Sequence, residues 1–331
     1  MRKNIINEKS NNVNLEIIRN YSKAIARDPR NSFFYFERAR AKEDYGDFKG
    51  AIEDFNNSFK INQDLKAIFY RANSKYKYGD FEGAIIDYEK LNLFEKNKDQ
   101  IFYNLASAQL INFDYQNAIN NFTKSIGYDD KDEFAYLYRG NSKFKLEDYE
   151  GSSKDYGKSL GINHRSYIAW NNRGVSNFKL KNYRGALEDF EKSLKINPKN
   201  YISLYNRGFS KAELNDHQGA IDDFSKSLLI NDQNINALFN RAYSRAELND
   251  HKGAIKDYTS VIEINPKSEN AFINRGVAKS NLQDNEGAIQ DYSNAIKINP
   301  KNKTSFHNRG LRKASLGLFS DAIIDYSEAI E

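Results

Sequence analysis

The chain carries two stripes of apolar and small residues that return together about every 34 positions. In residues 201–234, Leu204 and Gly208 mark the first stripe, and Ala220 and Phe224 mark the second. Residues spaced three or four positions apart lie on one face of a helix. A polar turn separates the two stripes, so the pattern predicts two helices in each stretch of 34 residues.

An arginine at a fixed place in the first stripe sets the period. It recurs at intervals of 34 residues as Arg139, Arg173, Arg207, Arg241, Arg275 and Arg309. All four prolines also fall in one place, just after the second stripe of a unit. Internal repetition of this length overrides the two-domain expectation that chain length alone would give.

This pattern divides residues 32–331 into nine tandem units of a single array. A half-repeat over 14–31 precedes them, and 1–13 is an N-terminal extension that is a candidate for disorder. Two helices of about 13 residues are marginal by themselves, so neighbouring units must stack to build a continuous core. The units are 32–64, 65–98, 99–132, 133–166, 167–200, 201–234, 235–268, 269–302 and 303–331.

Two positions in the unit hold small residues throughout the array. The glycine position is occupied by Gly140, Gly174, Gly208, Gly276 and Gly310, and the alanine position by Ala51, Ala84, Ala118, Ala186, Ala220, Ala254, Ala288 and Ala322. With this pattern the chain resembles the tetratricopeptide repeat family over about residues 14–331. The resemblance implies an all-α fold, a right-handed α-solenoid superhelix of helix-turn-helix units whose first helices line the concave side. It also implies protein binding without catalysis, with no catalytic residue, no cofactor and no metal.

The repeated arginine is expected to pair with an aspartate of the same unit. In unit 99–132 Leu105 replaces the arginine and Asn121 replaces the aspartate, and this joint loss argues for an ion pair inside each unit. Partly buried pairs of this kind fix helix register more than they add net stability. The predicted structural pairs are Arg139–Asp155, Arg173–Asp189, Arg207–Asp223, Arg241–Asp257 and Arg275–Asp291.

The opposite face of each first helix is apolar, aromatic and rich in amides, although a solvated face is usually charged. The resemblance places this face inside the superhelix, and exposed apolar surface on this scale marks a partner site. The residues predicted to bind a peptide there are Asn172, Asn206, Asn240, Asn274, Asn308, Tyr205, Phe209, Phe239, Tyr243, Phe178 and Phe144.

The asparagines on this face form a column with one member in each successive unit. An asparagine offers a carbonyl and an NH₂ group, which match the backbone of an extended peptide. First helices about 8–10 Å apart and a rise of about 3.3 Å per residue bring one asparagine to roughly every third peptide residue. The alternative is that these side chains hydrogen-bond within the scaffold.

Composition narrows the chemistry further. The 331 residues contain no cysteine, which excludes disulfides, thiolate metal sites and a cysteine nucleophile. No stretch approaches the roughly 20 apolar residues of a membrane span, and the N-terminus lacks the apolar run of a signal peptide. We therefore expect a cytoplasmic protein without a membrane partner.

The charge pattern argues against nucleic acid as the main ligand. Lys+Arg number 50 against 45 Asp+Glu, for a net charge of +5. Between 167 and 302 the opposite face contributes Lys179 against Glu213 and Glu247, which gives no track for phosphates. Some family members grip a chaperone's C-terminal carboxylate with lysine at a position where this chain has none, so that mode is rejected.

The function expected from the sequence is a non-enzymatic scaffold or adaptor for protein–protein interaction. It would hold an extended peptide or a helix of another protein in the concave groove. One alternative is end-to-end self-assembly, a homodimer formed through the uncapped C-terminal repeat with Ile323, Tyr326 and Ile330. A weaker alternative is an RNA-binding helical-repeat protein.

Overall fold

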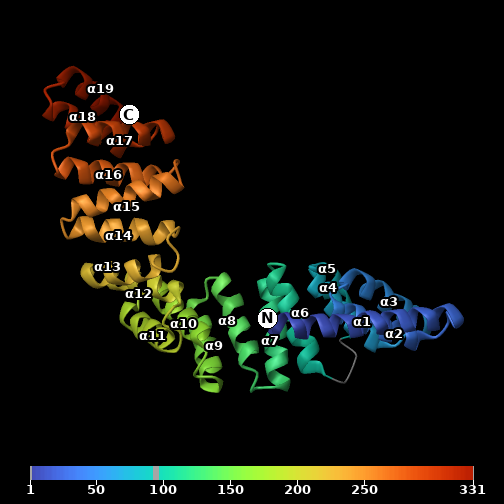
Figure 1. Ribbon diagram of the computed structural model, residues 1–331. Helices are drawn as coiled ribbons and strands as arrows, with labels where there is room; N and C mark the ends of the chain where they lie inside the picture. Colours follow the sequence, from blue (N-terminus) through green and yellow to red (C-terminus); the bar gives the residue numbers. More distant parts are fainter. Residues whose placement is uncertain (1, 92–96, 331) are drawn as a thin grey trace. The chain divides into compact units, whose positions relative to one another are not determined.

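The computed structural model describes residues 2–91 and 97–330, which form helices joined by short turns, with no strand among them (Figure 1). The chain divides into two compact units, Met1–His164 and Arg165–Glu331. The first unit and the second unit denote these two parts, each considered by itself, and a repeat denotes one stretch of about 34 residues. The nine-unit division of a single array stays a prediction. In the two described stretches, no helix combines the length and the apolar composition needed to cross a membrane.

The described part of the first unit contains helices α1 to α9. They are α1 (Arg2–Arg27), α2 (Ser32–Tyr45), α3 (Phe48–Asn62), α4 (Leu65–Tyr78), α5 (Phe81–Lys90), α6 (Lys98–Ile111), α7 (Tyr115–Tyr128), α8 (Glu133–Lys145) and α9 (Tyr149–Ile162). Even-numbered helices are the first helices of the repeats, and the odd-numbered helices from α3 onward are the second helices.

The second unit, described up to residue 330, contains α10 to α19, and Figure 1 shows α14 to α17 stacked one on another. The helices are α10 (Tyr167–Lys179), α11 (Tyr183–Ile196), α12 (Tyr201–Glu213), α13 (His217–Leu228), α14 (Ile235–Glu247), α15 (His251–Ile264), α16 (Glu269–Asn281), α17 (Asn285–Ile298), α18 (Lys303–Ser315) and α19 (Phe319–Ile330).

The N-terminal segment differs from the sequence expectation. Residues 2–13, expected to be an extension and a candidate for disorder, belong to helix α1, which continues to Arg27. No glycine or proline occurs before Pro29, so nothing in the segment interrupts the helix of the half-repeat. Residue 1 lies outside the described residues.

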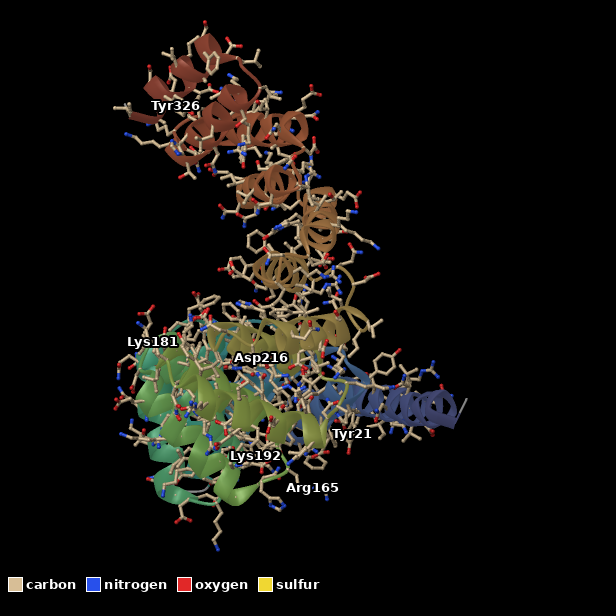
Figure 2. All side chains as sticks on the ribbon, turned by 90° about the vertical axis from the view of Figure 1, so that its left-hand side faces the viewer. Tyr21, Arg165, Lys181, Lys192, Asp216 and Tyr326 are labelled. Carbon is tan, nitrogen blue, oxygen red and sulfur yellow. The ribbon has the colours of Figure 1, made fainter. Side chains whose placement is uncertain are left out.

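In almost every repeat, an aspartate or asparagine caps the N-terminus of the second helix. Asp216, labelled in Figure 2, accepts a hydrogen bond from the backbone N–H of Gly219 at 2.9 Å. A cap of this type stabilises a helix by about 1 kcal/mol. A Cβ atom on Gly219 would lie 2.2 Å from Oδ2 of Asp216, so a larger residue here needs the aspartate side chain to shift, as in the repeat where Asp114 caps the N–H of Asn117.

The turn between the two helices of a repeat contains a residue in the left-handed region. Gly46, Gly79 and Gly317 occupy this place in three repeats, where glycine adopts a positive φ without strain. Other repeats place a side chain there, as in Lys181 at φ 60° and Asn215 at φ 63°. The same turn is thus built in some repeats at a conformational cost that glycine avoids.

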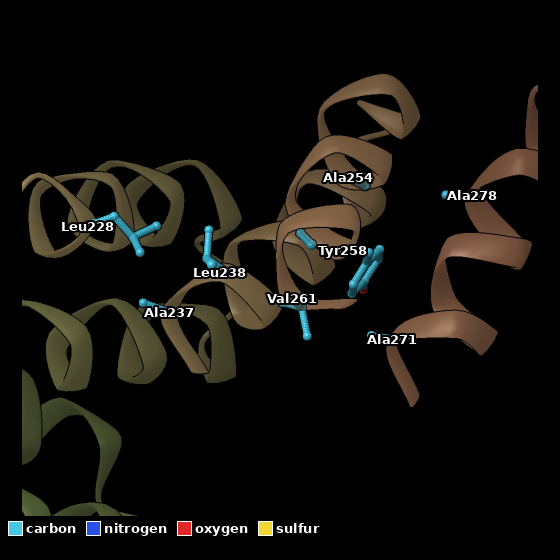
Figure 3. Packing of buried hydrophobic residues seen from close by; sticks show 9 residues of the cluster. Leu228, Ala237, Leu238, Ala254, Tyr258, Val261, Ala271 and Ala278 are labelled. Atoms are coloured by element: carbon cyan, nitrogen blue, oxygen red, sulfur yellow. The ribbon is translucent and has the colours of Figure 1, made fainter. Parts of the chain in front are cut away.

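The core runs between second helices and the small residues that face them. Figure 3 shows one stretch of it in the second unit, where Tyr258 and Val261 of α15 are 1% and 0% exposed. Ala237 and Ala271 pack in the same cluster and are fully buried. Burial of apolar area is the main source of stability, so each repeat depends on its neighbours for its share.

The first helices of successive repeats also pack against one another. This occurs between α4 and α6, α6 and α8, α10 and α12, α12 and α14, and α14 and α16. The second helices of successive repeats in the described residues do not pack together to the same extent. The first helices of successive repeats are therefore more closely spaced than the second helices.

Candidate functional site

The repeated arginine is held by the second helix of its own repeat. Arg207 donates two hydrogen bonds to Asp223, from Nε to Oδ2 at 2.8 Å and from Nη2 to Oδ1 at 2.6 Å. Lys211 adds an ion pair to Oδ2 at 2.8 Å. A two-pronged guanidinium–carboxylate contact fixes orientation as well as distance. The same contact joins Arg38–Asp54, Arg71–Asp87, Arg139–Asp155, Arg173–Asp189, Arg241–Asp257, Arg275–Asp291 and Arg309–Asp325.

A third contact of this arginine was not foreseen from the sequence. Nη1 of Arg241 donates to Ser225 at 3.1 Å, and Nη1 of Arg275 donates to Thr259 at 3.0 Å. Each hydroxyl belongs to the second helix of the preceding repeat, 16 residues before the arginine. A serine or threonine 16 residues before the arginine is the sequence signal that could have revealed this contact. The arginine therefore joins two repeats, and its donors are directed into the scaffold.

The repeat that lacks arginine replaces the charges with a neutral arrangement. Leu105 is 2% exposed, and Asn121 donates to Oε1 of Gln109 at 2.8 Å. The buried polar atoms at this place thus stay hydrogen-bonded without an ion pair, as buried amides require.

Asp87, Asp223 and Asp325 remain ionised in spite of burial. Burial opposes ionisation of Asp223, but hydrogen bonds from Arg207 and Lys211 outweigh it, so the pKa of Asp223 lies below its ordinary value. The pKa values of Asp87 and Asp325 are lowered by the same kind of partners against the same opposing burial. These carboxylates carry charge at neutral pH and act as fixed parts of the scaffold.

The asparagine column lies on the first helices, and several of its members hydrogen-bond between repeats. Nδ2 of Asn206 donates to Oδ1 of Asn171 at 3.1 Å, and Nδ2 of Asn240 donates to the Tyr205 hydroxyl at 3.0 Å. Asn274 hydrogen-bonds the Tyr258 side chain.

The other two members of the column are placed as follows. Asn172 accepts from Nδ2 of Asn171 at 3.3 Å, and Asn308 is half-buried on α18. Hydrogen bonds within the scaffold thus use part of the capacity of the column, which is the alternative that the sequence left open.

Most of the aromatic side chains expected in the groove pack on each other. The ring of Phe209 stacks on Phe178 at 5.0 Å and on Tyr205 at 6.1 Å between centroids. Phe239 lies edge-on to the buried Tyr258 at 5.3 Å. In the first unit Phe144 contacts Tyr149 at 5.2 Å. These rings are half-buried and give the surface its shape.

A set of exposed apolar residues remains on the first helices of the second unit. We call it the exposed row, and its members are Ile168, Ile202, Tyr243, Val277 and Leu311, which are 38–47% exposed. Three of them, Tyr243, Val277 and Leu311, stand 34 residues apart at one position of the repeat. The Glu247 side chain lies beside the Tyr243 hydroxyl, and a hydrogen bond to this carboxylate, with burial, raises the pKa of Tyr243.

The first unit contains a cavity of about 520 Å³ on the same side of its repeats. Its walls come mainly from the first helices α4, α6 and α8 and include Tyr76, Tyr103, Ser107, Leu110 and Tyr138. Aromatic walls with a few polar atoms are typical of binding pockets. We call this cavity the Ser107 pocket.

Models of the tetratricopeptide repeat family match four stretches of the chain. These are residues 99–132 and 269–302, 167–200, and 236–268. The chain thus contains tetratricopeptide repeats in these four stretches. Its helices form the helical-repeat solenoid of that family, and repeats of this kind serve as protein-interaction scaffolds. A comparison with curated protein sequences found no match.

Solved tetratricopeptide structures share the fold at low sequence identity. The C-terminal part of a repeat protein from Cytophaga hutchinsonii is 17% identical with a TM-score of 0.62, over 72% of this chain and 98% of that one. YrrB, described as having an unusual peptide-binding site, is 24% identical with a TM-score of 0.52, over 56% and 96%. The Cut9–Hcn1 hetero-tetramer of the APC/C is 15% identical with a TM-score of 0.55, over 83% and 55%.

Proposed function

We propose that this protein is a non-enzymatic adaptor that holds an extended segment or a helix of another protein along its first helices. The exposed row is the observation that supports this most. Exposed isoleucine, tyrosine and valine at repeated positions leave apolar area in water that a partner would cover. A partner chain laid along successive first helices would cover one member of the row after another.

The asparagine column has a secondary role in this proposal. A side-chain amide has two N–H groups and a carbonyl oxygen. The hydrogen bond from Asn206 to Asn171 and that from Asn240 to Tyr205 each use one N–H. We expect the second N–H and the carbonyl oxygen of each amide to bond the backbone of a bound segment. Replacing Asn206, Asn240 and Asn274 with alanine should then weaken binding, and unchanged affinity would remove this part of the proposal.

The decisive experiment compares two faces of the second unit. A partner is first identified by cross-linking and mass spectrometry, then purified, and its affinity is measured by calorimetry. Replacing Ile202, Tyr243 and Val277 with alanine should weaken binding at least about tenfold, because central apolar contacts carry most binding energy. The matched control is Leu229→Ala, which removes a leucine that is 87% exposed at the end of α13, away from the exposed row. Equal affinities of the triple variant and the control would refute the proposal.

Salt dependence separates this function from RNA binding. Lys179, Glu213 and Glu247 are exposed at the edge of the row and give no excess of positive charge. Binding of a partner through apolar contacts should change little with salt, whereas neutralisation of several phosphates loses orders of magnitude in affinity. A steep loss of affinity with salt would favour RNA.

Self-assembly is a second candidate, and one observation supports it. Helix α19 exposes Phe319, Ile323, Ile324 and Ile330, with exposed fractions from 60% to 83%. A second copy of the chain would cover this apolar surface.

A further inference from the structure

The Ser107 pocket lies between side chains of successive first helices in the first unit. Tyr76 from α4 and Tyr103 from α6 stand on its walls, with Tyr138 from α8 on the far side. The Tyr88 hydroxyl and Nδ2 of Asn104 both donate to Oδ1 of Asn73, so these polar groups are paired, while Oγ of Ser107 is buried without a hydrogen-bond partner among the described residues. What the pocket offers to a guest is chiefly the surface of tyrosine rings, with Leu110 beside them.

Comparison with the second unit shows which group fits such a space. Each pocket residue has an equivalent 102 residues later, three repeats along the chain. Tyr76 corresponds to Phe178, Tyr103 to Tyr205, and Ser107 to Phe209.

In the second unit, the ring of Phe209 stacks on both of the other rings, with centroids 5.0 and 6.1 Å away. The first unit has serine at this position, and this serine lines the cavity. The repeat itself therefore places an aromatic ring in the equivalent space.

The charges at the pocket favour a neutral guest. Lys77, the one charged residue among the described residues on its walls, is paired with Glu43 at 2.7 Å. Burial raises the pKa of Tyr103, and the neighbouring Tyr138 hydroxyl raises it further, so the phenol stays neutral at physiological pH. A charged guest would lose hydration here without gaining an unpaired opposite charge.

We propose that the Ser107 pocket receives an aromatic side chain of the partner protein, which takes the place that Phe209 fills in the second unit. The proposal names one anchor of the partner and so rests on the proposed function. Aromatic rings gain from offset or edge contacts with other rings as well as from the area they bury. A ring between Tyr76 and Tyr103 would make both kinds of contact.

The test uses N-acetyl-phenylalanine amide as a neutral probe and N-acetyl-leucine amide as its aliphatic control. Binding to the full chain is followed by NMR of tyrosine rings labelled with ¹³C. The phenylalanine probe should bind about fivefold to tenfold more tightly than the leucine probe, because only its ring can stack on the tyrosines. Shifted resonances should include Tyr76 and Tyr103. Equal binding of the two probes would overturn the proposal.

Reciprocal variants place the effect in this pocket. Ser107→Phe supplies the ring from the chain itself and should reduce probe binding about tenfold. Phe209→Ser opens the equivalent space in the second unit and should create a second binding position beside Tyr205. Ser107→Leu is a smaller filling variant that serves if Ser107→Phe does not fold, as judged by circular dichroism.

Each outcome of these variants decides the question. Undiminished binding to a folded filling variant contradicts the proposal, and so does the absence of a new position in a folded Phe209→Ser. The probe needs no partner protein, so its failure is distinct from failure of the proposed function. If the probe binds as expected but alanine substitutions in the exposed row leave partner affinity unchanged, the pocket proposal is supported and the proposal of binding along the exposed row is refuted.

Discussion

Single residues in the turns show where the repeats differ in strain. Lys181, labelled in Figure 2, has φ 60° and an exposed side chain, in the place where other repeats have glycine. A left-handed conformation costs a non-glycine residue about 1–2 kcal/mol. Glycine also raises the conformational entropy of the unfolded chain, which lowers the free energy of unfolding by about 0.4–1 kcal/mol and offsets part of the gain.

Lys181→Gly should therefore raise the free energy of unfolding by about 0.5 kcal/mol. The measurement is the midpoint of urea unfolding. Asn215→Gly is the matched control in the next repeat, because asparagine adopts φ 63° with little strain and its replacement should bring no gain. A lower midpoint for Lys181→Gly than for the control would contradict this account.

Comparison of repeats within one chain explains what the sequence could predict at this scale. The joint loss of arginine and aspartate in unit 99–132 pointed to the contact that Arg207 makes with Asp223. The bond from Arg241 to Ser225 was missed because it depends on how the preceding repeat packs against the one that contains the arginine. The Ser107 pocket was missed for a similar reason, since a cavity arises from what several helices leave unfilled.

Pairs of helices are joined by the arginine–aspartate contact, and unit 99–132 supplies a neutral alternative to it. Asp223 has a side chain only 1% exposed, so Arg207→Leu would leave its charge short of one partner while Lys211 remains. Removal of one side of a buried pair costs about 3–5 kcal/mol. The remaining lysine reduces this, and we expect a loss of about 2 kcal/mol for Arg207→Leu.

The triple variant Arg207→Leu/Lys211→Gln/Asp223→Asn copies Leu105, Gln109 and Asn121. It should lose less stability than Arg207→Leu alone, because the new amides can hydrogen-bond as Asn121 does with Gln109. Urea unfolding of the single and triple variants measures the difference. If the triple variant were the less stable one, the pairs would contribute net stability and not chiefly register.

Helix boundaries were easier to predict than the role of each face. The caps at Asp216 and its equivalents, and the breaks near the four prolines, are local signals. The role of the first-helix face was harder to predict, because it depends on packing between repeats. Asn206 and Phe209 were expected to face a partner, and their contacts with Asn171 and Phe178 arise from the neighbouring repeat.

For the molecule as a whole, the buried aspartates predict how stability depends on pH. The pKa values of Asp87, Asp223 and Asp325 are lower in the folded chain than the ordinary value of 3.8. A lowered pKa gives stability that is fully present above the unfolded value and is lost as pH falls through the folded value. The urea midpoint should therefore fall steeply below about pH 4.

The triple variant described above provides the control for this pH dependence. It lacks the Asp223 carboxylate, so its urea midpoint should fall less between neutral and acid pH than that of the wild type. The same acid sensitivity in both proteins would mean that the Asp223 pair does not contribute to the pH dependence.

The exposed face of α19 predicts association of whole molecules. Ile323 is 64% exposed, while its equivalent Ile255 is partly buried against the core of the second unit. Tyr326, labelled in Figure 2, and Ile330 border a cavity of about 440 Å³ on the same face. Exposed apolar surface of this kind favours burial against another copy.

Sedimentation coefficients should therefore rise with protein concentration, and Ile323→Lys/Ile330→Lys should abolish the rise. Ile86→Lys, at a side chain 54% exposed on α5, should leave it unchanged. Sedimentation that is independent of concentration, or an equal effect of both substitutions, would exclude association through α19.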